Sequence, residues 1–329
     1  MLPALDDLLA VAHVVSLPMR VPFRGVRTRE ALLLRGPRGW AEFAPFVEYP
    51  DAEAARWLAA AVATGWAEPV PAVRDRVPVN ATVPAVPASG VAAVLARFDG
   101  CTTAKVKVAQ AGQGLADDVA RVAQVRALLG PAGRVRVDAN GAWSVDDARR
   151  AVVALARYDL EYVEQPCATL AELAALRRAL AASGIDVPVA ADESIRKAED
   201  PLRVAAAGSA DLVVLKVAPL GGVRAALAVA QACGLPVVVS SALDTSVGIA
   251  AGVALAAALP DLPYACGLGT VGLFEHDVSS RPLRPVAGAL DVAASAAVDA
   301  DRIPSCRAPA DRTAWWLERM RRCHALLTP

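Results

Sequence analysis

The run VRVDAN at residues 135–140 is a short, Val-rich stretch that ends in polar residues, and a helical stretch at Val145–Arg157 follows it. The same order of apolar run, polar end, loop and Ala-, Leu- and Arg-rich stretch repeats along the chain from about Val77. The longer stretches carry apolar residues at three- and four-residue spacing, which is typical of helices, whereas the short runs are typical of buried strands. This repetition predicts parallel strands joined by helices.

Eight apolar runs follow residue 76, and this number favours a closed barrel over an open doubly wound sheet. They are VPVNATV (77–83), AKVKV (104–108), VRVDAN (135–140), LEYVEQP (160–166), VPVAADES (187–194), DLVVLKV (211–217), LPVVVSS (235–241) and YACGLG (264–269). The expected outer helices include Asp117–Leu129, Val145–Arg157, Leu170–Ala182 and Val223–Cys233, with a buried helix in the uncharged run between Asp244 and Asp261. The predicted fold class is therefore α/β, with a TIM-type barrel over residues 77–278.

The two ends of the chain differ from this pattern. Residues 1–76 predict an α+β capping domain, with two or three antiparallel strands, a turn at Gly36 and Gly39, and a helix from about Asp51 to Thr64. The Pro- and Ala-rich segment 279–329 ends in a predicted helix with Trp315 and Trp316 on it. We expect this segment to pack back on the capping domain, because tryptophans bury large apolar surfaces.

Charge and composition restrict the class of partner. The 329 residues include 34 acidic and 34 basic side chains, so no net charge attracts nucleic acid or an anionic membrane. The longest uncharged run has sixteen residues, fewer than the ~20 of a membrane span, and no secretory signal pattern follows MLPALDD. We predict a cytoplasmic protein that acts on a small-molecule carboxylate. The oligomeric state is left open, and a monomer is compatible with the sequence.

Charged residues close the apolar runs at a regular interval. From Lys107 the spacing is 31 residues to Asp138, 26 to Glu164, 28 to Asp192 and 24 to Lys216. Each interval has the length of one strand and one helix, so one charged group is expected per strand at the same rim of the barrel. The carboxyl ends of the strands form the rim where barrel enzymes place their active sites.

The alternation of side chains along a strand predicts which of these groups point inward. Lys105 and Lys107 share one face of their strand, and Asp138 shares its face with Asn140 and Arg136. By the same rule Asp192 points inward and Glu193 outward or sideways. Three inward carboxylates without His or Cys are hard oxygen donors, which favour Mg²⁺ or Mn²⁺ over zinc.

The two lysines at the ends of opposite strands suggest the base and the second cation of a proton-transfer reaction. Lys107 and Lys216 close strands that lie four positions apart, and hence on opposite sides of an eight-stranded barrel. Burial and the neighbouring Lys105 lower the pKa of a lysine toward the range of a useful base. These groups predict abstraction of a proton α to a metal-bound carboxylate. The alternatives are charges that merely pair with one another, a non-enzymatic barrel whose acidic ring binds metal structurally, or a scaffold protein that uses the Trp315–Trp316 helix as an interface.

The motifs AKVKV, VDANGAW, VEQP, ADES and LKVAPLGG occur in an order and spacing that resemble the muconate-lactonizing subgroup of the enolase superfamily. This resemblance implies a (β/α)7β barrel with an α+β N-terminal capping domain. It also implies that Asp138, Glu164 and Asp192 are magnesium ligands and that Lys107 is the acid/base on one face. Lys216 would then be the lysine on the other face, and Lys105 and Asn140 would support them.

Within the subgroup, the short length and the segments SSALDTSVG and CGLGT are most similar to dehydratases. Those lyases convert 2-succinyl-6-hydroxy-2,4-cyclohexadiene-1-carboxylate to 2-succinylbenzoate in menaquinone biosynthesis. The resemblance implies that Lys107 would take the α-proton and later protonate the leaving hydroxyl, while Lys216 stabilises charge. An N-acylamino acid racemase of the same subgroup is the alternative. Dipeptide epimerases are disfavoured because YACGLGTVGLF lacks their DxD pair.

Small residues at the ends of the last two runs are candidates for substrate binding. Ser240, Ser241, Gly267 and Gly269 offer hydroxyl or backbone N–H groups for the succinyl carboxylate, although tight packing turns would explain the same residues. In the capping domain, a lid over the substrate is predicted from Arg20, Phe23, Arg24 and Gly25.

Overall fold

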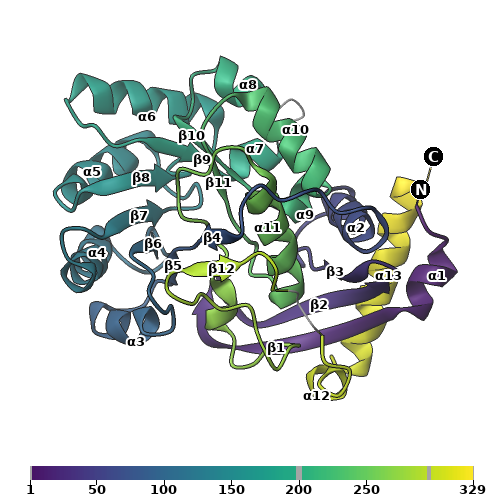
Figure 1. Cartoon of the computed structure of the whole chain (residues 1–329). Coiled ribbons are helices and arrows are strands. Elements are labelled where there is room, and N and C mark those ends of the chain that lie inside the picture. The colour runs from purple at the N-terminus through teal and green to yellow at the C-terminus, as the bar shows by residue number, and fades with distance from the viewer. Residues whose placement is uncertain (1, 198–201, 295–297, 329) are drawn as a thin grey trace.

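The computed structural model describes residues 2–197, 202–294 and 298–328. An antiparallel sheet and its helices lie beside a ring of parallel strands (Figure 1). The antiparallel sheet has the order β1-β2-β3, with β1 at Ala12–Phe23, β2 at Val26–Gly36 and β3 at Gly39–Phe43. The predicted turn between Gly36 and Gly39 is confirmed, because these two residues form the last pair of the β2–β3 ladder.

The β1–β2 hairpin turns through two residues, Arg24 and Gly25. Their φ angles are 52° and 79°, and Phe23 pairs with Val26 on either side of them. Two left-handed residues give the hairpin turn whose twist matches that of the strands. Gly25 adopts this conformation without strain, and the tip of the hairpin is thereby fixed in direction.

Two long helices pack against this sheet. Helix α2 (Asp51–Trp66) contacts both β3 and the C-terminal helix α13 (Ala310–Leu327), and the short α1 (Leu5–Ala10) lies beside α13 (Figure 1). Trp316 of α13 is fully buried, stands edge-on 5.9 Å from Phe43 and donates from Nε1 to Glu30 at 2.8 Å. The predicted C-terminal helix and the packing of its tryptophan on the N-terminal sheet are confirmed.

The barrel contains seven parallel strands in the order β11-β10-β9-β8-β7-β6-β5. These are β5 (Ala81–Val83), β6 (Thr103–Lys107), β7 (Arg134–Asp138), β8 (Leu160–Glu164), β9 (Val189–Ala191), β10 (Leu212–Leu215) and β11 (Val237–Val239).

The barrel closes between β11 and β5 through residues 264–269. This run forms single parallel bridges, from Cys266 to Val79 and from Gly267 to Ser240, instead of the predicted regular strand. The predicted strand 77–83 is also divided. Its first part, β4 (Arg76–Pro78), pairs antiparallel with β12 (Ala289–Asp291), and β5 enters the barrel. Proline has no N–H for a ladder and glycine has no side chain to pack, so both runs pair over shorter lengths than their apolar pattern suggests.

Helices cover the outside of the ring, as Figure 1 shows. The four predicted outer helices and the buried one are confirmed, with ends that differ by at most two residues. They are α4 (Leu115–Leu129), α5 (Val145–Ala156), α6 (Leu170–Ala182), α10 (Val223–Cys233) and α11 (Ser246–Ala258). The shorter helices are α3 (Val91–Leu95), α7 (Glu193–Lys197), α8 (Leu202–Ala206), α9 (Val217–Leu220), α12 (Ile303–Cys306) and the 3-10 turns η1 (Ala88–Gly90) and η2 (Thr270–Leu273). Within the described ranges, no helix has the length and apolar composition that a bilayer crossing requires.

The strands bury both of their faces. On β10, Val213 and Leu215 belong to the large core between strands and helices, whereas Leu212 and Val214 belong to a separate small cluster. That cluster fills the inside of the ring with Tyr162, Ala190, Leu212, Val214 and Val238. The inward positions closer to the carboxyl ends of the strands are charged or polar, and they form the floor of the site described next.

Candidate active site at the carboxyl ends of the strands

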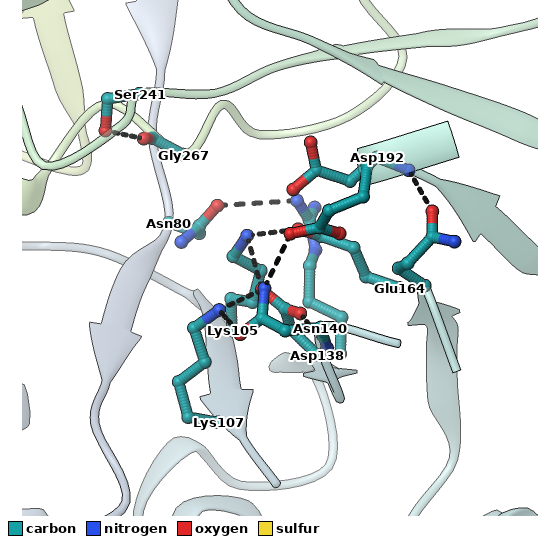
Figure 2. Close-up of polar contacts among 12 residues, drawn as sticks. Asn80, Lys105, Lys107, Asp138, Asn140, Glu164, Asp192, Ser241 and Gly267 are labelled. Carbon is teal, nitrogen blue, oxygen red and sulfur yellow. Dashed lines mark hydrogen bonds and ion pairs between the residues drawn. The ribbon is translucent and has the colours of Figure 1, made fainter. Parts of the chain in front are cut away.

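The charged residues predicted to share a rim do so. Lys107, Asp138 and Glu164 end three neighbouring strands, and they are direct partners in the β6–β7 and β7–β8 ladders. Asp192 and Lys216 follow directly after β9 and β10. Figure 2 shows the side chains of Lys105 and Lys107 directed toward Asp138. The register of the parallel strands and the alternation of side chains along them therefore bring five of the predicted groups, together with Lys105, into one place.

The two lysines of β6 bind the carboxylates of β7 and β8. Lys105 Nζ lies 2.6 Å from Glu164 Oε1 and 3.2 Å from Asp138 Oδ2. Lys107 donates to Asp138 and, at 2.7 Å, to Asn140 Oδ1. Both lysines, Asp138 and Glu164 are at most 8% exposed, so these are buried ion pairs.

Lys216 makes a separate pair on the other side of the ring. Its Nζ lies 2.8 Å and 2.5 Å from the two carboxylate oxygens of Asp192. Strands β6 and β10 are four positions apart in the sheet, as predicted for lysines on opposite sides of a barrel. The space between Lys107 and Lys216 is therefore flanked by two ammonium groups.

Burial and neighbouring charges shift the pKa values of these groups in different directions. Burial lowers the pKa of Lys107, and Lys105 lowers it further, while Asp138 opposes the change. Burial would also lower the pKa of Lys105, but Glu164 and Asp138 more than offset that effect and raise it. Of the two lysines on β6, Lys107 is thus the one whose neutral form is favoured.

The carboxylates show the same contrast. Burial, followed by repulsion from Asp138, raises the pKa of Glu164 to about 8. Burial acts in the same direction on Asp138, but Lys107 and Lys105 outweigh it and hold its pKa below the usual range. Further positive charge beside Glu164 would compensate for this cost, because an uncompensated buried carboxylate is unfavourable.

The donor set fits a hard divalent cation. Glu164 Oε2 is buried and has no hydrogen-bond partner among the residues that the structure describes, which is uncommon for a carboxylate oxygen and leaves a strong acceptor unused. Asp138, Glu164 and Asp192 supply oxygen ligands of the kind that Mg²⁺ and Mn²⁺ prefer. In the structure, lysines bind both oxygens of Asp192 and one oxygen each of Asp138 and Glu164. No three His, Cys, Asp or Glu side chains among the described residues stand ready to hold a metal as they are.

Asn140 joins the site to Glu193, whose direction the sequence pattern left open. Its φ is 48°, its N–H donates to Asp138 Oδ1 at 3.0 Å, and its Nδ2 donates to Glu193 Oε1 at 3.1 Å. Of the two predicted directions for Glu193, this contact excludes the outward one and agrees with the sideways one. Strand β9 ends at Ala191 and α7 begins at Glu193, so the two-residue alternation no longer applies there.

Gln165 is a second residue that the pattern did not single out. It is fully buried, and its Oε1 accepts from the backbone N–H of Asp192 at 2.9 Å and of Ser194 at 3.2 Å. Its Nε2 donates to Ser194 Oγ at 2.7 Å. Gln165 thus fixes the turn that presents Asp192 to the site. Its position directly after Glu164, at the end of β8, was the feature of the sequence that could have identified it as a site residue.

A small cavity lies above the charged ring. It is lined from the N-terminal sheet and the segment after it by Phe23, Arg24 and Phe46, and from the barrel by Thr82, Lys105, Lys107, Asp138, Asn140, Asp192, Lys216, Ser240, Ser241, Ala242, Leu243, Gly267 and Thr270. A larger vestibule of about 570 Å³ adjoins it and shares Phe23, Arg24, Lys107 and Asn140 with it. The vestibule gives a path to Lys107.

The predicted lid residues divide into two groups. Phe23 and Arg24 line both cavities, and the Phe23 ring centroid lies 5.1 Å from Lys107 Nζ. Gly25 lines the vestibule. Arg20 instead donates from Nε to the Phe274 carbonyl and from Nη2 to the Glu275 carbonyl, both at 2.9 Å, and so anchors the hairpin to the barrel.

Three of the four candidate substrate-binding residues in the last two runs line the cavity. Ser240, Ser241 and Gly267 line it, but their backbone N–H groups donate to the carbonyls of Leu215, Gly267 and Val239. The Ser241 hydroxyl also donates to the Gly267 carbonyl, at 2.8 Å, so within the described part of the chain the Ser240 hydroxyl is the donor left for a ligand at these three residues. A Cβ on Gly269 would lie 3.1 Å from the Phe98 ring, so tight packing accounts for that glycine.

Two family models match the chain, the enolase C-terminal domain-like model at residues 90–296 and the enolase N-terminal domain-like model at residues 14–68. The o-succinylbenzoate synthase of Mycobacterium tuberculosis (strain H37Rv) is 58% identical over 329 residues, which is 100% of this chain and 98% of that protein. The o-succinylbenzoate synthase of Mycolicibacterium smegmatis is 59% identical over 326 residues, 99% of this chain and 98% of that protein.

Solved structures show the same fold at lower identity. The muconate lactonizing enzyme of Pseudomonas putida superposes with a TM-score of 0.73 at 20% identity, covering 90% of this chain and 98% of that chain. The L-Ala-D/L-Glu epimerase of Bacillus subtilis gives a TM-score of 0.73 at 24% identity, covering 85% and 94%. The named relatives give the alternative of an N-acylamino acid racemase no support.

Proposed function

The chain belongs to the o-succinylbenzoate synthases of the enolase superfamily, and we propose from this premise that Lys107 and Lys216 act on a substrate carboxylate held between them. The family's reaction is the chain's reaction. It is a lyase that removes water from 2-succinyl-6-hydroxy-2,4-cyclohexadiene-1-carboxylate to give 2-succinylbenzoate. The product belongs to menaquinone biosynthesis.

The observation that carries the proposal is the position of two lysines on strands four apart, on either side of one cavity that Asp138 and Asp192 also line. A carboxylate placed there has a cation on each face. Its α-carbon can then be within reach of Lys107 Nζ, which also lines the vestibule. A base must be close to the proton it removes before its pKa matters.

Lys107 is proposed as the acid/base. In its neutral form its Nζ accepts the proton from the carbon α to the carboxylate, and the electron pair of that C–H bond forms the new double bond. The ammonium so produced gives its proton to the β-hydroxyl, the C–O bond breaks, and water leaves. Burial and Lys105 favour the neutral starting form by lowering the pKa of Lys107.

Enzymes of the enolase superfamily depend on a divalent metal, and we propose that Asp138, Glu164 and Asp192 hold it here, with Mg²⁺ as the first choice and Mn²⁺ as the alternative. When bound, the cation supplies the positive charge that makes a proton α to a carboxylate removable. Lys105 and Asn140 position Lys107 and the carboxylates. Lys216 stabilises the negative charge of the opposite substrate face electrostatically.

The rest of the substrate is proposed to contact the upper part of the cavity. The Arg24 guanidinium is suited to the succinyl carboxylate, because its planar fork pairs with two carboxylate oxygens. The hydroxyls of Ser240 and Ser241 are further candidates, although Ser241 Oγ already donates to the Gly267 carbonyl at 2.8 Å. Gly267 contributes space, since a Cβ there would lie 2.4 Å from Ser240 Oγ.

Several broader expectations stay proposals. The catalytic barrel is proposed to span residues 77–278, and the capping domain residues 1–76 with segment 279–329 against it. The partner is proposed to be a small carboxylate rather than nucleic acid or a membrane, in a cytoplasmic enzyme, because basic and acidic residues balance at 34 each. A monomer is the simplest assembly.

The proposal is tested by incubating the purified chain with Mg²⁺ and the cyclohexadiene substrate, and in parallel with N-succinyl amino acids. Formation of 2-succinylbenzoate is followed by absorbance, and racemisation by polarimetry. We expect dehydration of the cyclohexadiene. Racemisation without dehydration would overturn the assignment.

A further inference from the structure

Two buried charged residues of the N-terminal sheet reach across to the barrel loop that joins β11 to α11. Arg29 lies on β2 and is 3% exposed, and Glu42 lies on β3 and is 9% exposed. Neither is a member of the lysine–carboxylate ring. Their partners in the barrel lie within residues 242–248, which belong to the SSALDTSVG segment.

Arg29 binds the carbonyl groups of this loop. Its Nε donates to the Leu243 carbonyl at 3.1 Å and its Nη2 to the Ala242 carbonyl at 3.3 Å, and Nη2 also donates to the Ala44 carbonyl. Leu243 has a φ of 65°, a conformation that residues with a side chain adopt at a cost. A guanidinium fork that binds two consecutive carbonyls holds the loop in this unusual conformation.

Glu42 binds the N–H groups at the start of α11. Its carboxylate accepts from the Thr245 backbone N–H at 3.1 Å, from Thr245 Oγ1 at 2.5 Å and from the Gly248 N–H at 3.2 Å. A carboxylate on β3 therefore satisfies donors of the first turn of a barrel helix. A Cβ on Gly248 would lie 3.2 Å from the Glu42 carboxyl carbon and 2.6 Å from Asp244 Cβ, so glycine leaves the room for this contact.

The loop held in this way forms a wall of the active-site cavity. Ser241, Ala242 and Leu243 line that cavity, on the same side as Ser240. Phe46 lines it too, and its ring lies 4.5 Å from the Arg29 guanidinium carbon. The contacts of Arg29 thus end on groups that face the substrate space, although Arg29 itself does not line the cavity.

We propose that Arg29 and Glu42 are positioning residues for the reaction, which hold loop 241–245 in the conformation that receives the substrate. Burying an arginine and a glutamate at this junction costs more than packing apolar side chains there. What these two side chains provide is direction, because each fixes particular backbone groups of one loop. The inference rests on the proposed binding of substrate at this wall of the cavity.

The variants Arg29→Met and Glu42→Ala test the proposal in the full-length protein with Mg²⁺. We expect amide hydrogen exchange at residues 242–248 to accelerate by about tenfold or more, because Thr245 and Gly248 lose their acceptor in Glu42→Ala. We also expect KM for the cyclohexadiene substrate to rise by about fivefold or more, with a smaller change in kcat. Glu42→Gln keeps one acceptor oxygen and should restore part of the KM.

Arg312→Met is the matched control, because Arg312 binds Glu30 on the outer side of the same strand β2. It should lower thermal stability without changing KM. The proposal is overturned if KM stays unchanged in Arg29→Met and Glu42→Ala, whether or not exchange of the loop accelerates. A KM that rises equally in Arg312→Met also overturns it. Failure of the proposed function can be told apart from failure of this positioning role, because in the former case the unmodified protein would not dehydrate the substrate.

Discussion

Lys216 holds both carboxylate oxygens of Asp192, at 2.8 Å and 2.5 Å. Asp192 is also a proposed metal ligand, so the ammonium and the metal compete for the same oxygens. We expect Lys216→Met to bind Mg²⁺ at least as tightly as the unmodified chain, while kcat falls by about a hundredfold or more. Isothermal titration calorimetry and steady-state kinetics measure the two effects. Weaker Mg²⁺ binding in this variant would argue against Asp192 as a ligand.

The acid/base assignment predicts a selective loss of activity in Lys107→Ala. General acid–base catalysis contributes about 10²–10⁴-fold, so kcat should fall by at least that much. Circular dichroism should show that the variant stays folded, although its melting temperature should fall because Asp138 loses one of its two buried ammonium partners. Arg134→Ala, at the opposite end of the neighbouring strand β7, is the control and should keep its kcat. An unchanged kcat in Lys107→Ala would show that Lys107 is not the acid/base.

The proposed ligands predict dependence on a divalent cation. Treatment with a chelator should abolish dehydration, and Mg²⁺ or Mn²⁺ should restore it. Asp138→Asn and Glu164→Gln should each weaken Mg²⁺ binding by about tenfold or more, since each replaces a charged ligand by a neutral one. Calorimetric titration checks both variants. If the chelated protein kept its full rate, the metal would have no role in the reaction.

Glu42 predicts a pH dependence of stability. Burial, followed by repulsion from Asp244, raises the pKa of Glu42 from 4.5 to about 8. Between these values the folded chain binds a proton that the unfolded chain has released, so the free energy of unfolding should fall as pH rises. The slope is at most about 1.4 kcal/mol per pH unit. Urea unfolding between about pH 5 and pH 8 measures it.

The control for this slope is Glu42→Gln, which cannot titrate. Its stability should fall less steeply with pH than that of the unmodified chain. A residual slope is expected, because burial also raises the pKa of Asp244. Parallel curves for the two proteins would mean that Glu42 does not carry the effect.

Arg24 predicts a change in substrate affinity. It is exposed at the tip of the β1–β2 hairpin, lines both cavities, and its guanidinium carbon lies 5.1 Å from the Phe46 ring centroid. If it pairs with the succinyl carboxylate, Arg24→Met should raise KM by about 10-fold to 100-fold. Arg27→Met, an exposed arginine three residues further along the same hairpin, should leave KM unchanged. Equal effects of the two substitutions would point to a general effect of charge.

Local patterns were sufficient to predict the rim of charged residues. Strand alternation and a repeat of similar length place Lys107, Asp138 and Glu164 in register, because neighbouring parallel strands pair residue for residue. The same rules left two directions open for Glu193, because β9 ends at Ala191 and the alternation stops there. The rules also overestimated the run at 264–269, where glycines and a proline-interrupted partner reduce pairing to single bridges.

Local sequence patterns could not predict contacts between segments that are distant in the sequence. Glu42 and Thr245 are 203 residues apart, and nothing near either residue indicates the other. The ion pairs of the lysines are a similar case. Alternation predicts that Lys105 and Lys107 point inward, but the choice of Glu164 or Asp138 as partner depends on side-chain reach and packing in the folded ring.

The closing segment at residues 264–269 has a consequence for how such enzymes change over generations. It closes the ring through backbone groups, and it contributes none of the lysines or carboxylates, yet Gly267 and the adjoining Thr270 face the substrate space. Substitutions there leave the reacting side chains themselves unchanged. A descendant lineage can therefore acquire a new substrate preference while the proton-transfer apparatus of its ancestor is passed on intact.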